Sequence, residues 1–166
     1  MGVEVNFSMK PRIDNIDRSI LNCLHDDARM HCSEISRRLG NISDRAVRNR
    51  LDRLLKDGYI EIKAGAIPER LGFPISADIA MDVEPGSIHL VAKNLIDLDE
   101  VNYVAMTTGD TDISVSVVAA SMGDLQTFLT EKLHSIPGVR KTKTYVHTRV
   151  LKQSCDWSFP EDLPEI

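Results

Sequence analysis

Four arginines stand close together between residues 43 and 55, in the stretch SDRAVRNRLDRLL. The whole chain of 166 residues carries a formal net charge of -5, yet residues 37–56 hold seven basic side chains against two acidic ones. A basic segment on an acidic chain indicates a surface that attracts a polyanion. Arginine can offer two donors to guanine and asparagine can pair with adenine, so Arg45, Arg48 and Asn49 are suited to reading base edges in DNA.

The element that must present these side chains is a helix. Ser43 is a favoured N-cap residue, and Gly58 favours a stop at Lys56 or the residue after it. At about 100° per residue, one apolar stripe runs along this helix and contains Val47, Leu51, Leu54 and Leu55. Arg45 and Asn49, together with Arg53, then point away from the stripe.

Two shorter helices are expected before this one. Asp14 caps the first, over residues 15–25, in which apolar residues repeat at helical spacing. Ser33 begins the second, and Gly40 ends it because glycine tolerates the positive φ of a helix C-terminus. Three short helices with a tight turn between the last two are typical of a helix-turn-helix unit. The third helix of such a unit enters the major groove, which admits one α-helix.

We therefore expect this unit to bind double-stranded DNA. Arg45, Arg48 and Asn49 are the base-reading candidates, and the basic residues around them are better placed for phosphates, which position a protein without reading sequence. The full set of predicted DNA-contacting residues is Ser43, Asp44, Arg45, Arg48, Asn49, Arg50, Arg53, Arg37 and Arg38. The alternative interpretation is a charged helix face that is merely solvated, as most charge runs are.

The rest of the chain shows a different pattern, in which strand and helix signals alternate. A short period-two strand is expected at residues 59–64, followed by a linker with two prolines and two glycines. Further strands are expected at 75–83, 101–107, 113–119 and 141–150, with helices at 87–94 and 123–135. This order is βαββαβ, a ferredoxin-like unit, so the fold class is α+β. The predicted organisation is a helix-turn-helix domain with its exit strand at 1–64, a linker at 65–74, a dimerisation and sensing domain at 75–154 and a tail at 155–166.

Neither half shows a catalytic or metal-binding constellation. The three cysteines, Cys23, Cys32 and Cys155, have irregular spacing and are interpreted as reduced thiols, and the five histidines are dispersed. No apolar run approaches the roughly 18 residues of a membrane helix, and the N-terminus lacks the apolar core of a signal peptide. We therefore expect a cytoplasmic protein that is not an enzyme, does not bind a membrane and needs no cofactor or metal.

Short motifs along the chain resemble the Lrp/AsnC family of bacterial and archaeal transcription regulators. They are IDNIDRSIL at 13–21, DDAR at 26–29, EISRRLG at 34–40, VRNRL at 47–51, GYI at 58–60, TGDTD at 108–112 and IPGV at 136–139. The resemblance extends from about residue 13 to residue 151. It implies a helix-turn-helix domain joined to a ligand-sensing domain, homodimers built through the sheets that often assemble into octamers, and a small effector, typically an amino acid, bound between dimers.

The resemblance also implies where the effector binds. The candidates carried over from the family are Thr107, Gly109, Asp110, Asp112, Thr142 and Thr144. Two features depart from the family pattern: one additional residue lies between Gly40 and Val47, and the tail beyond residue 154 is longer than usual. Trp157 and Phe159 of this tail are expected to cover the sheet, or alternatively to pack across a subunit interface.

Two alternative functions follow from the same architecture. Siroheme decarboxylases resemble these regulators in both halves, but they need basic and aromatic residues around an acidic tetrapyrrole. Residues 65–166 hold 8 basic and 15 acidic side chains, a balance of -7, which disfavours such an enzyme. The other alternative is a weakly specific protein that compacts DNA.

Overall fold

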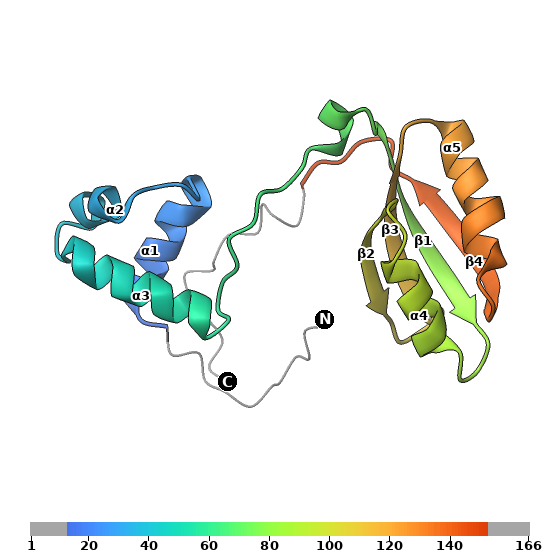
Figure 1. The fold of residues 1–166 in the computed structure, drawn as a ribbon, viewed down its shortest axis with the longest axis horizontal. Helices are drawn as coiled ribbons and strands as arrows, with labels where there is room; N and C mark the ends of the chain where they lie inside the picture. The colour runs from blue at the N-terminus through green and yellow to red at the C-terminus, as the bar shows by residue number, and fades with distance from the viewer. Residues whose placement is uncertain (1–12, 153–166) are drawn as a thin grey trace. The chain divides into compact units, whose positions relative to one another are not determined.

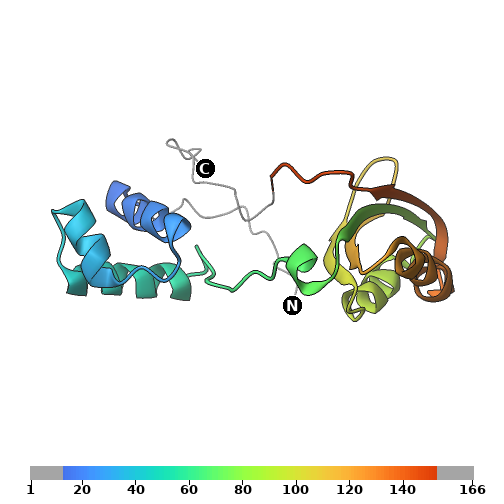
Figure 2. The same ribbon diagram turned by 90° about the horizontal axis from the view of Figure 1, so that it is seen from above.

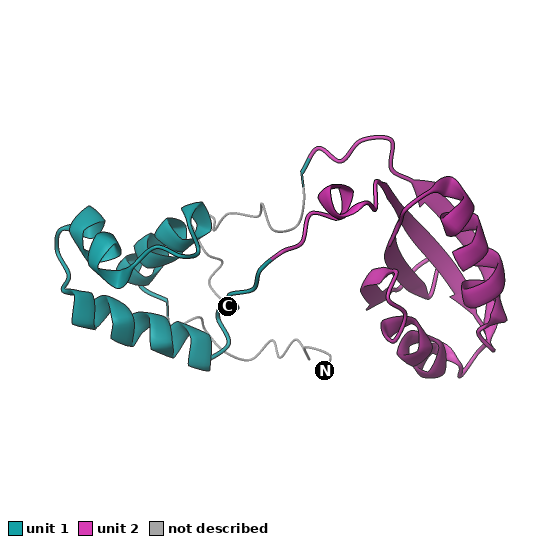
Figure 3. Cartoon of the chain, turned by 45° about the horizontal axis from the view of Figure 1, so that its top comes forward, with its two compact units in different colours: residues 1–64, 152–166 teal, residues 65–151 magenta. Residues whose placement is uncertain are grey.

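The computed structural model describes residues 13–152, which form two compact units, at 13–64 and 65–151 (Figure 3). The predicted roles of Trp157 and Phe159, and the thiol of Cys155, lie outside the described residues. Among the described residues, no helix has the length and apolar character needed to cross a membrane.

The first unit contains three helices: α1 (Asn15–Asp26), α2 (Cys32–Leu39) and α3 (Asp44–Lys56) (Figure 1). Asp14 caps α1 as predicted. The Asp17 N–H donates to Asp14 Oδ1 at 2.9 Å, and the Asp14 N–H donates to Asp17 Oδ2 at 3.1 Å, so the two residues form a reciprocal capping box. The prediction that Ser33 begins α2 is wrong, because the helix begins at Cys32 after His31, whose side chain makes no cap hydrogen bond.

Helix α3 begins as predicted, with the Ala46 N–H donating to Ser43 Oγ at 3.3 Å. Val47 and Leu54 are fully buried, and Leu51 is half-buried. Leu55 was expected in the same stripe but is 38% exposed, since it lies about 100° around the helix from Leu54, at the edge of the buried face.

Residues 59–64 do not form the predicted strand. A strand is defined by ladder hydrogen bonds to a neighbour, and no segment between residues 13 and 152 pairs with this stretch. The predicted linker contains one short 3₁₀ helix, η1 (Pro68–Leu71).

The second unit is a four-stranded antiparallel sheet covered on one face by two helices (Figures 1 and 2). Its elements are β1 (Ile75–Val83), α4 (Ile88–Ile96), β2 (Val101–Met106), β3 (Ile113–Ala119), α5 (Met122–Thr127) and β4 (Val139–Val146), with strand order β2-β3-β1-β4. The predicted βαββαβ order and the α+β class are confirmed. Every second residue of β1 from Ala77 onward, and every second residue of β3, is buried, as the period-two pattern predicts.

Two predicted elements of this unit differ from the structure. The helix expected over 123–135 is α-helical only to Thr127 and continues as a π-helical turn, η2 (Phe128–Lys132), and a 3₁₀ turn, η3 (Leu133–Ser135). The change of pitch keeps Phe128 and Leu133 buried. The last strand, predicted at 141–150, begins at Val139 and ends at Val146. It ends there because its partner β1 begins at Ile75, and the last bond between the two segments is from the His147 N–H to the Ser76 carbonyl.

Candidate functional site

The turn between α2 and α3 is held by the backbone and by one side chain. Gly40 ends α2 in the left-handed region with φ 70°, and its N–H donates to the Ser36 carbonyl. The Ser36 hydroxyl donates to the Ile42 carbonyl at 2.7 Å. The turn that carries the additional residue is therefore anchored to α2, and the side chains of Ile20, Ile35 and Val47 are fully buried behind it.

The side chains of Arg45, Arg48 and Asn49 lie in solvent on the first half of α3. Within residues 13–152, none of the three makes a side-chain hydrogen bond or an ion pair. The base-reading candidates thus keep their donors available for a ligand.

The other two arginines of α3 are engaged by α1. Arg50 Nη1 donates to Asp14 Oδ2 at 2.7 Å and to Asp17 Oδ1 at 2.8 Å, and Arg53 Nη2 donates to Asp17 Oδ2. Asp17 is 0% exposed. We call these four residues the carboxylate clamp. Arg53 was expected to point away from the buried stripe, but it binds the buried Asp17. Arg50, a predicted phosphate contact, binds Asp14 and Asp17.

The clamp shifts the pKa of two of its members. The Asp17 N–H and the Arg50 guanidinium together hold the pKa of Asp14 below its ordinary value, because both favour the ionised carboxylate. The hydrogen bonds to Asp14 and Asp17 raise the pKa of Arg50. The clamp is therefore a set of charge-assisted hydrogen bonds rather than a loose surface contact.

The two arginines of α2 remain accessible. The side chain of Arg37 is 80% exposed, and its Nη2 lies 4.0 Å from Glu34 Oε1. Arg38 Nη2 donates to Glu34 Oε1 at 3.2 Å, and Arg38 Nη1 lies 3.9 Å from Asp26 Oδ2. Exposed pairs of this kind contribute little energy, so both guanidinium groups can exchange a carboxylate for a phosphate.

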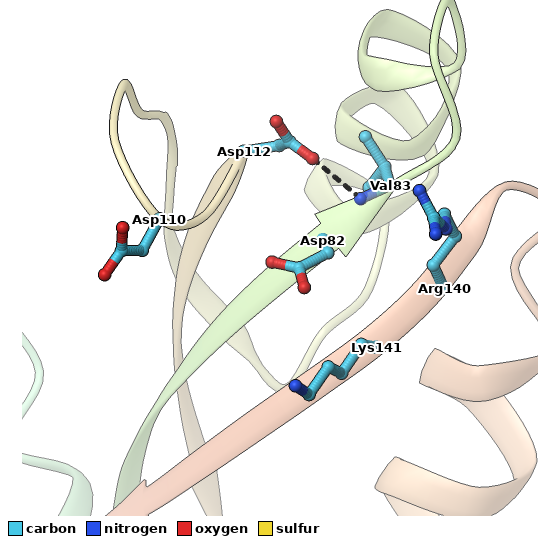
Figure 4. A pocket seen from close by; sticks show the side chains of 6 residues that line it. All are labelled: Asp82, Val83, Asp110, Asp112, Arg140 and Lys141. Carbon is cyan, nitrogen blue, oxygen red and sulfur yellow. Dashed lines mark hydrogen bonds between the residues drawn. The ribbon is translucent and has the colours of Figure 1, made fainter.

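The second unit has a polar pocket of about 590 Å³ where β1 ends and β4 begins (Figure 4). It is lined by Asp82, Val83, Asp110, Asp112, Arg140 and Lys141. The register of the β1–β4 pairing shifts between Asp82 and Val83, at this pocket. Such irregularities redirect side chains and are common beside functional sites.

A network of hydrogen bonds holds the loop between β2 and β3 against the end of β1. The Val83 N–H donates to Asp112 Oδ2 at 2.9 Å, and the Asp112 N–H donates to the Met81 carbonyl at 2.9 Å. Thr107 completes the loop: its N–H donates to the Asp112 carbonyl at 2.8 Å, and its hydroxyl donates to the Thr111 carbonyl at 2.6 Å. Thr107 and Asp112 therefore shape the loop, and Asp110 carries its exposed carboxylate.

The structure brings together only part of the predicted effector set. Asp110 and Asp112 line the pocket, whereas Thr107, Gly109, Thr142 and Thr144 are not among its lining residues. Thr142 and Thr144 pair with Met81 and Ile79, on the sheet face that the helices cover, and Thr142 Oγ1 lies 2.9 Å from His134 Nε2.

Four lining residues were not predicted from the sequence: Asp82, Val83, Arg140 and Lys141. Asp82 and Lys141 are Cα partners in the β1–β4 ladder. The available signal was the IPGV motif at 136–139, which directly precedes Arg140 and Lys141.

Comparison with known proteins matches each unit to a family. Residues 13–61 match a winged helix-turn-helix DNA-binding family, and residues 76–157 match the Lrp/AsnC ligand binding domain. An HTH-type transcriptional regulator of Pyrococcus abyssi is 40% identical over 151 residues, which cover 90% of this chain and 95% of the relative. Relatives of this kind are transcriptional regulators and not enzymes.

Two solved structures share the fold. AsnC of E. coli has a TM-score of 0.80 at 26% identity, covering 85% of this chain and 95% of AsnC. A transcriptional regulator of Neisseria meningitidis, solved as a complex with L-Met, has a TM-score of 0.81 at 23% identity, covering 89% of this chain and 96% of that one. The chain therefore belongs to the Lrp/AsnC family of helix-turn-helix transcriptional regulators and joins a DNA-binding unit to a ligand-binding domain.

Proposed function

We propose that this protein is a cytoplasmic, sequence-specific regulator that binds DNA as a dimer or larger assembly and responds to an amino acid. The observation that carries the DNA-binding part is the free exposed set of Arg45, Arg48 and Asn49 on the first turns of α3, directly after an anchored turn. Arginine to guanine and asparagine to adenine are the bidentate contacts that distinguish base pairs in the major groove.

Phosphate contacts would come from the exposed arginines of α2 and from the start of α3. Arg37 and Arg38 are accessible, and the N-terminal end of α3 at Ser43 and Asp44 presents backbone N–H groups to an anion. In a two-fold symmetric dimer, paired α3 helices enter successive major grooves about 34 Å apart, so the operator is roughly palindromic.

The dimer would form through the face of the sheet that no helix covers. The pairing register places Asp78, Asp82, Lys141, Lys143, Tyr103 and Tyr145 on this face. Tyr103 and Tyr145 are 56% and 57% exposed. Acidic residues on β1 beside basic residues on β4 make the face complementary to a second copy turned by two-fold symmetry.

The dimer proposal is tested by placing a charge on each face of this unit. Tyr145→Lys alters the helix-free face, and Leu90→Lys, at a residue of α4 that is 53% exposed, is the matched control on the helix face. Sedimentation equilibrium should show a shift toward monomer for Tyr145→Lys alone. Equal assembly of the two variants and the unchanged protein would place the subunit interface elsewhere.

The effector would bind in the polar pocket between β1 and β4. Arg140 and Lys141 suit a carboxylate, and Asp82 and Asp110 suit an ammonium group, so the lining carries both signs that a free amino acid requires. Asp112 holds the loop, and the L-Met complex of the related fold from Neisseria meningitidis supports an amino acid as the chemical class.

The DNA-binding proposal is tested by selecting bound duplexes from a random pool and measuring affinity for single-base variants of the selected site. Arg45→Ala and Asn49→Ala should each relax specificity at one base pair by about 1–3 kcal/mol. Lys93→Ala, an exposed basic residue of α4, is the matched control. A loss that is the same for every sequence would refute base reading, and equal affinity for selected and random duplexes would favour an architectural protein.

The effector proposal is tested by thermal shift with each of the twenty amino acids. A ligand that binds the folded protein raises its melting temperature, and Arg140→Gln and Asp110→Asn should each reduce that rise. Asp97→Asn, which alters an exposed carboxylate outside the pocket, should leave it unchanged. A response that survives both pocket substitutions would place the effector elsewhere.

A further inference from the structure

The carboxylate clamp divides the arginines of α3 into two classes. At about 100° per residue, Arg45 and Asn49 lie opposite the buried stripe, whereas Arg50 and Arg53 lie on the flank that faces α1. The side chain of Arg50 is 28% exposed and that of Arg53 is 39% exposed, and both are bound to the fully buried Asp17. The flank that faces α1 thus carries two guanidinium groups opposite two carboxylates.

We propose that Asp14 and Asp17 are positioning residues that withhold Arg50 and Arg53 from DNA phosphates and thereby limit sequence-independent binding. This inference rests on the proposed function of α3 as the reading helix. It concerns how the protein keeps its specificity, because phosphate contacts supply most of non-specific affinity.

Displacing either carboxylate by a phosphate is unfavourable in this geometry. Asp17 has no solvent-exposed surface, so removing Arg53 from it would leave a buried carboxylate with fewer partners. Asp14 is fixed from the other side, since it accepts the Asp17 N–H and its own N–H donates to Asp17 Oδ2. The two carboxylates are therefore held in place by α1 itself, and Arg50 bridges them.

The clamp has a measurable consequence for the salt dependence of binding. Each phosphate that a basic side chain neutralises adds about 0.9 to the slope of log affinity against log salt. One such contact changes affinity roughly 3.5-fold when the salt concentration changes fourfold. Two withheld arginines therefore leave the slope about 1.8 smaller than it would be if both arginines bound phosphates.

The test measures affinity for the selected operator and for a random duplex as a function of salt, with the full chain. The variants are Arg50→Gln, Arg53→Gln and, as the comparison on the free face of α3, Arg45→Gln. Circular dichroism establishes that each variant is folded before binding is measured. Arg50→Gln and Arg53→Gln should leave the slope on both duplexes unchanged, whereas Arg45→Gln should lower affinity for the operator.

A second arm loosens the clamp instead of removing an arginine. Asp14 is half exposed, with 53% of its side chain accessible, so Asp14→Asn is expected to fold and to free Arg50 from one of its two carboxylates. It should steepen the slope on the random duplex by up to about 0.9 and strengthen binding to it severalfold. Asp57→Asn removes an equal charge at the far end of α3 and is the matched control for net charge.

The outcomes separate this inference from the proposed function. A slope that falls by about 0.9 in Arg50→Gln or Arg53→Gln would show that the clamp opens on DNA and would overturn the inference while leaving DNA binding in place. Equal effects of Asp14→Asn and Asp57→Asn would also overturn it, because net charge alone would then explain the change. If Arg45→Gln binds both duplexes like the unchanged protein, the assignment of α3 as the reading helix fails.

Discussion

Substituting Gly138 by alanine should destabilise the second unit and lower the affinity of its pocket for the proposed effector. Gly138 has φ 97°, a conformation that a residue with a Cβ adopts at a cost of about 1–2 kcal/mol. A Cβ built there would lie 2.7 Å from Ser87 Cβ and 3.0 Å from Ser87 Oγ, and relieving such overpacking costs about 1–3 kcal/mol. Together these effects predict a loss of about 2–5 kcal/mol in the free energy of unfolding.

The consequence for the pocket follows from the position of this residue. The Glu84 N–H donates to the Gly138 carbonyl at 2.8 Å, which ties the start of β4 to the end of β1. Arg140 and Lys141 come directly after this tie. Moving Gly138 away from Ser87 should therefore displace the side chains of Arg140 and Lys141, which we propose bind the carboxylate of the effector.

Hydrogen–deuterium exchange of the β1 and β4 amides in the full chain measures the stability of this unit separately from the other. Gly109→Ala is the matched control, because Gly109 has φ 126° but open space around its added Cβ, so only the backbone cost applies. Ser87→Gly removes the contacted atoms, and in combination with Gly138→Ala it should restore part of the lost stability. If Gly138→Ala costs no more than Gly109→Ala, or if Ser87→Gly restores nothing, the steric reasoning is refuted.

Three further predictions concern the first unit. Leu54→Ala should lower the free energy of unfolding by about 2–5 kcal/mol, because Leu54 is 0% exposed and its loss leaves a cavity, and urea unfolding measures this change. Ser43→Ala should cost about 1 kcal/mol by removing the cap of α3, as measured by the same unfolding curves. The pKa of Asp14 is lowered in the folded state by the Asp17 N–H and by Arg50, so the unfolded chain takes up the proton first as the pH falls. This contribution to stability is present above the ordinary value of 3.8 and is lost as the pH falls through the lower folded pKa; acid unfolding of Asp14→Asn should lack it.

The features that could be predicted from the sequence are those that depend on neighbouring residues. Ser43 as a cap and Gly40 as a left-handed helix end need only a few adjacent positions, and the structure has both. The strands at 75–83 and 113–119 were predicted with the bounds that the structure shows, because their burial alternates with a strict period of two.

The features that could not be predicted depend on distant contacts. Arg50 is separated from Asp14 by 36 positions and from Asp17 by 33, so no local pattern reveals the clamp. Asp82 and Lys141 meet only through the β1–β4 register, which shifts at the pocket. A one-residue change of register moves a side chain to the other face of a sheet, so lining residues require the pairing itself.

The carboxylate clamp reduces the positive charge that residues 37–56 leave available to DNA. Counted along the sequence, its seven basic side chains suggest a strong and indiscriminate attraction to DNA. In the structure, Arg50 and Arg53 face carboxylates of α1, whereas Arg37 and Arg38 stay accessible. The positive charge that DNA meets is therefore smaller than the sequence total, and the exposed donors of α3 belong mainly to residues suited to reading bases. If the clamp withholds Arg50 and Arg53 from phosphates, as we propose, the sequence-independent attraction to DNA is reduced. A smaller share of the binding energy is then sequence-independent, and the ratio of specific to non-specific affinity is what matters among competing genomic sites.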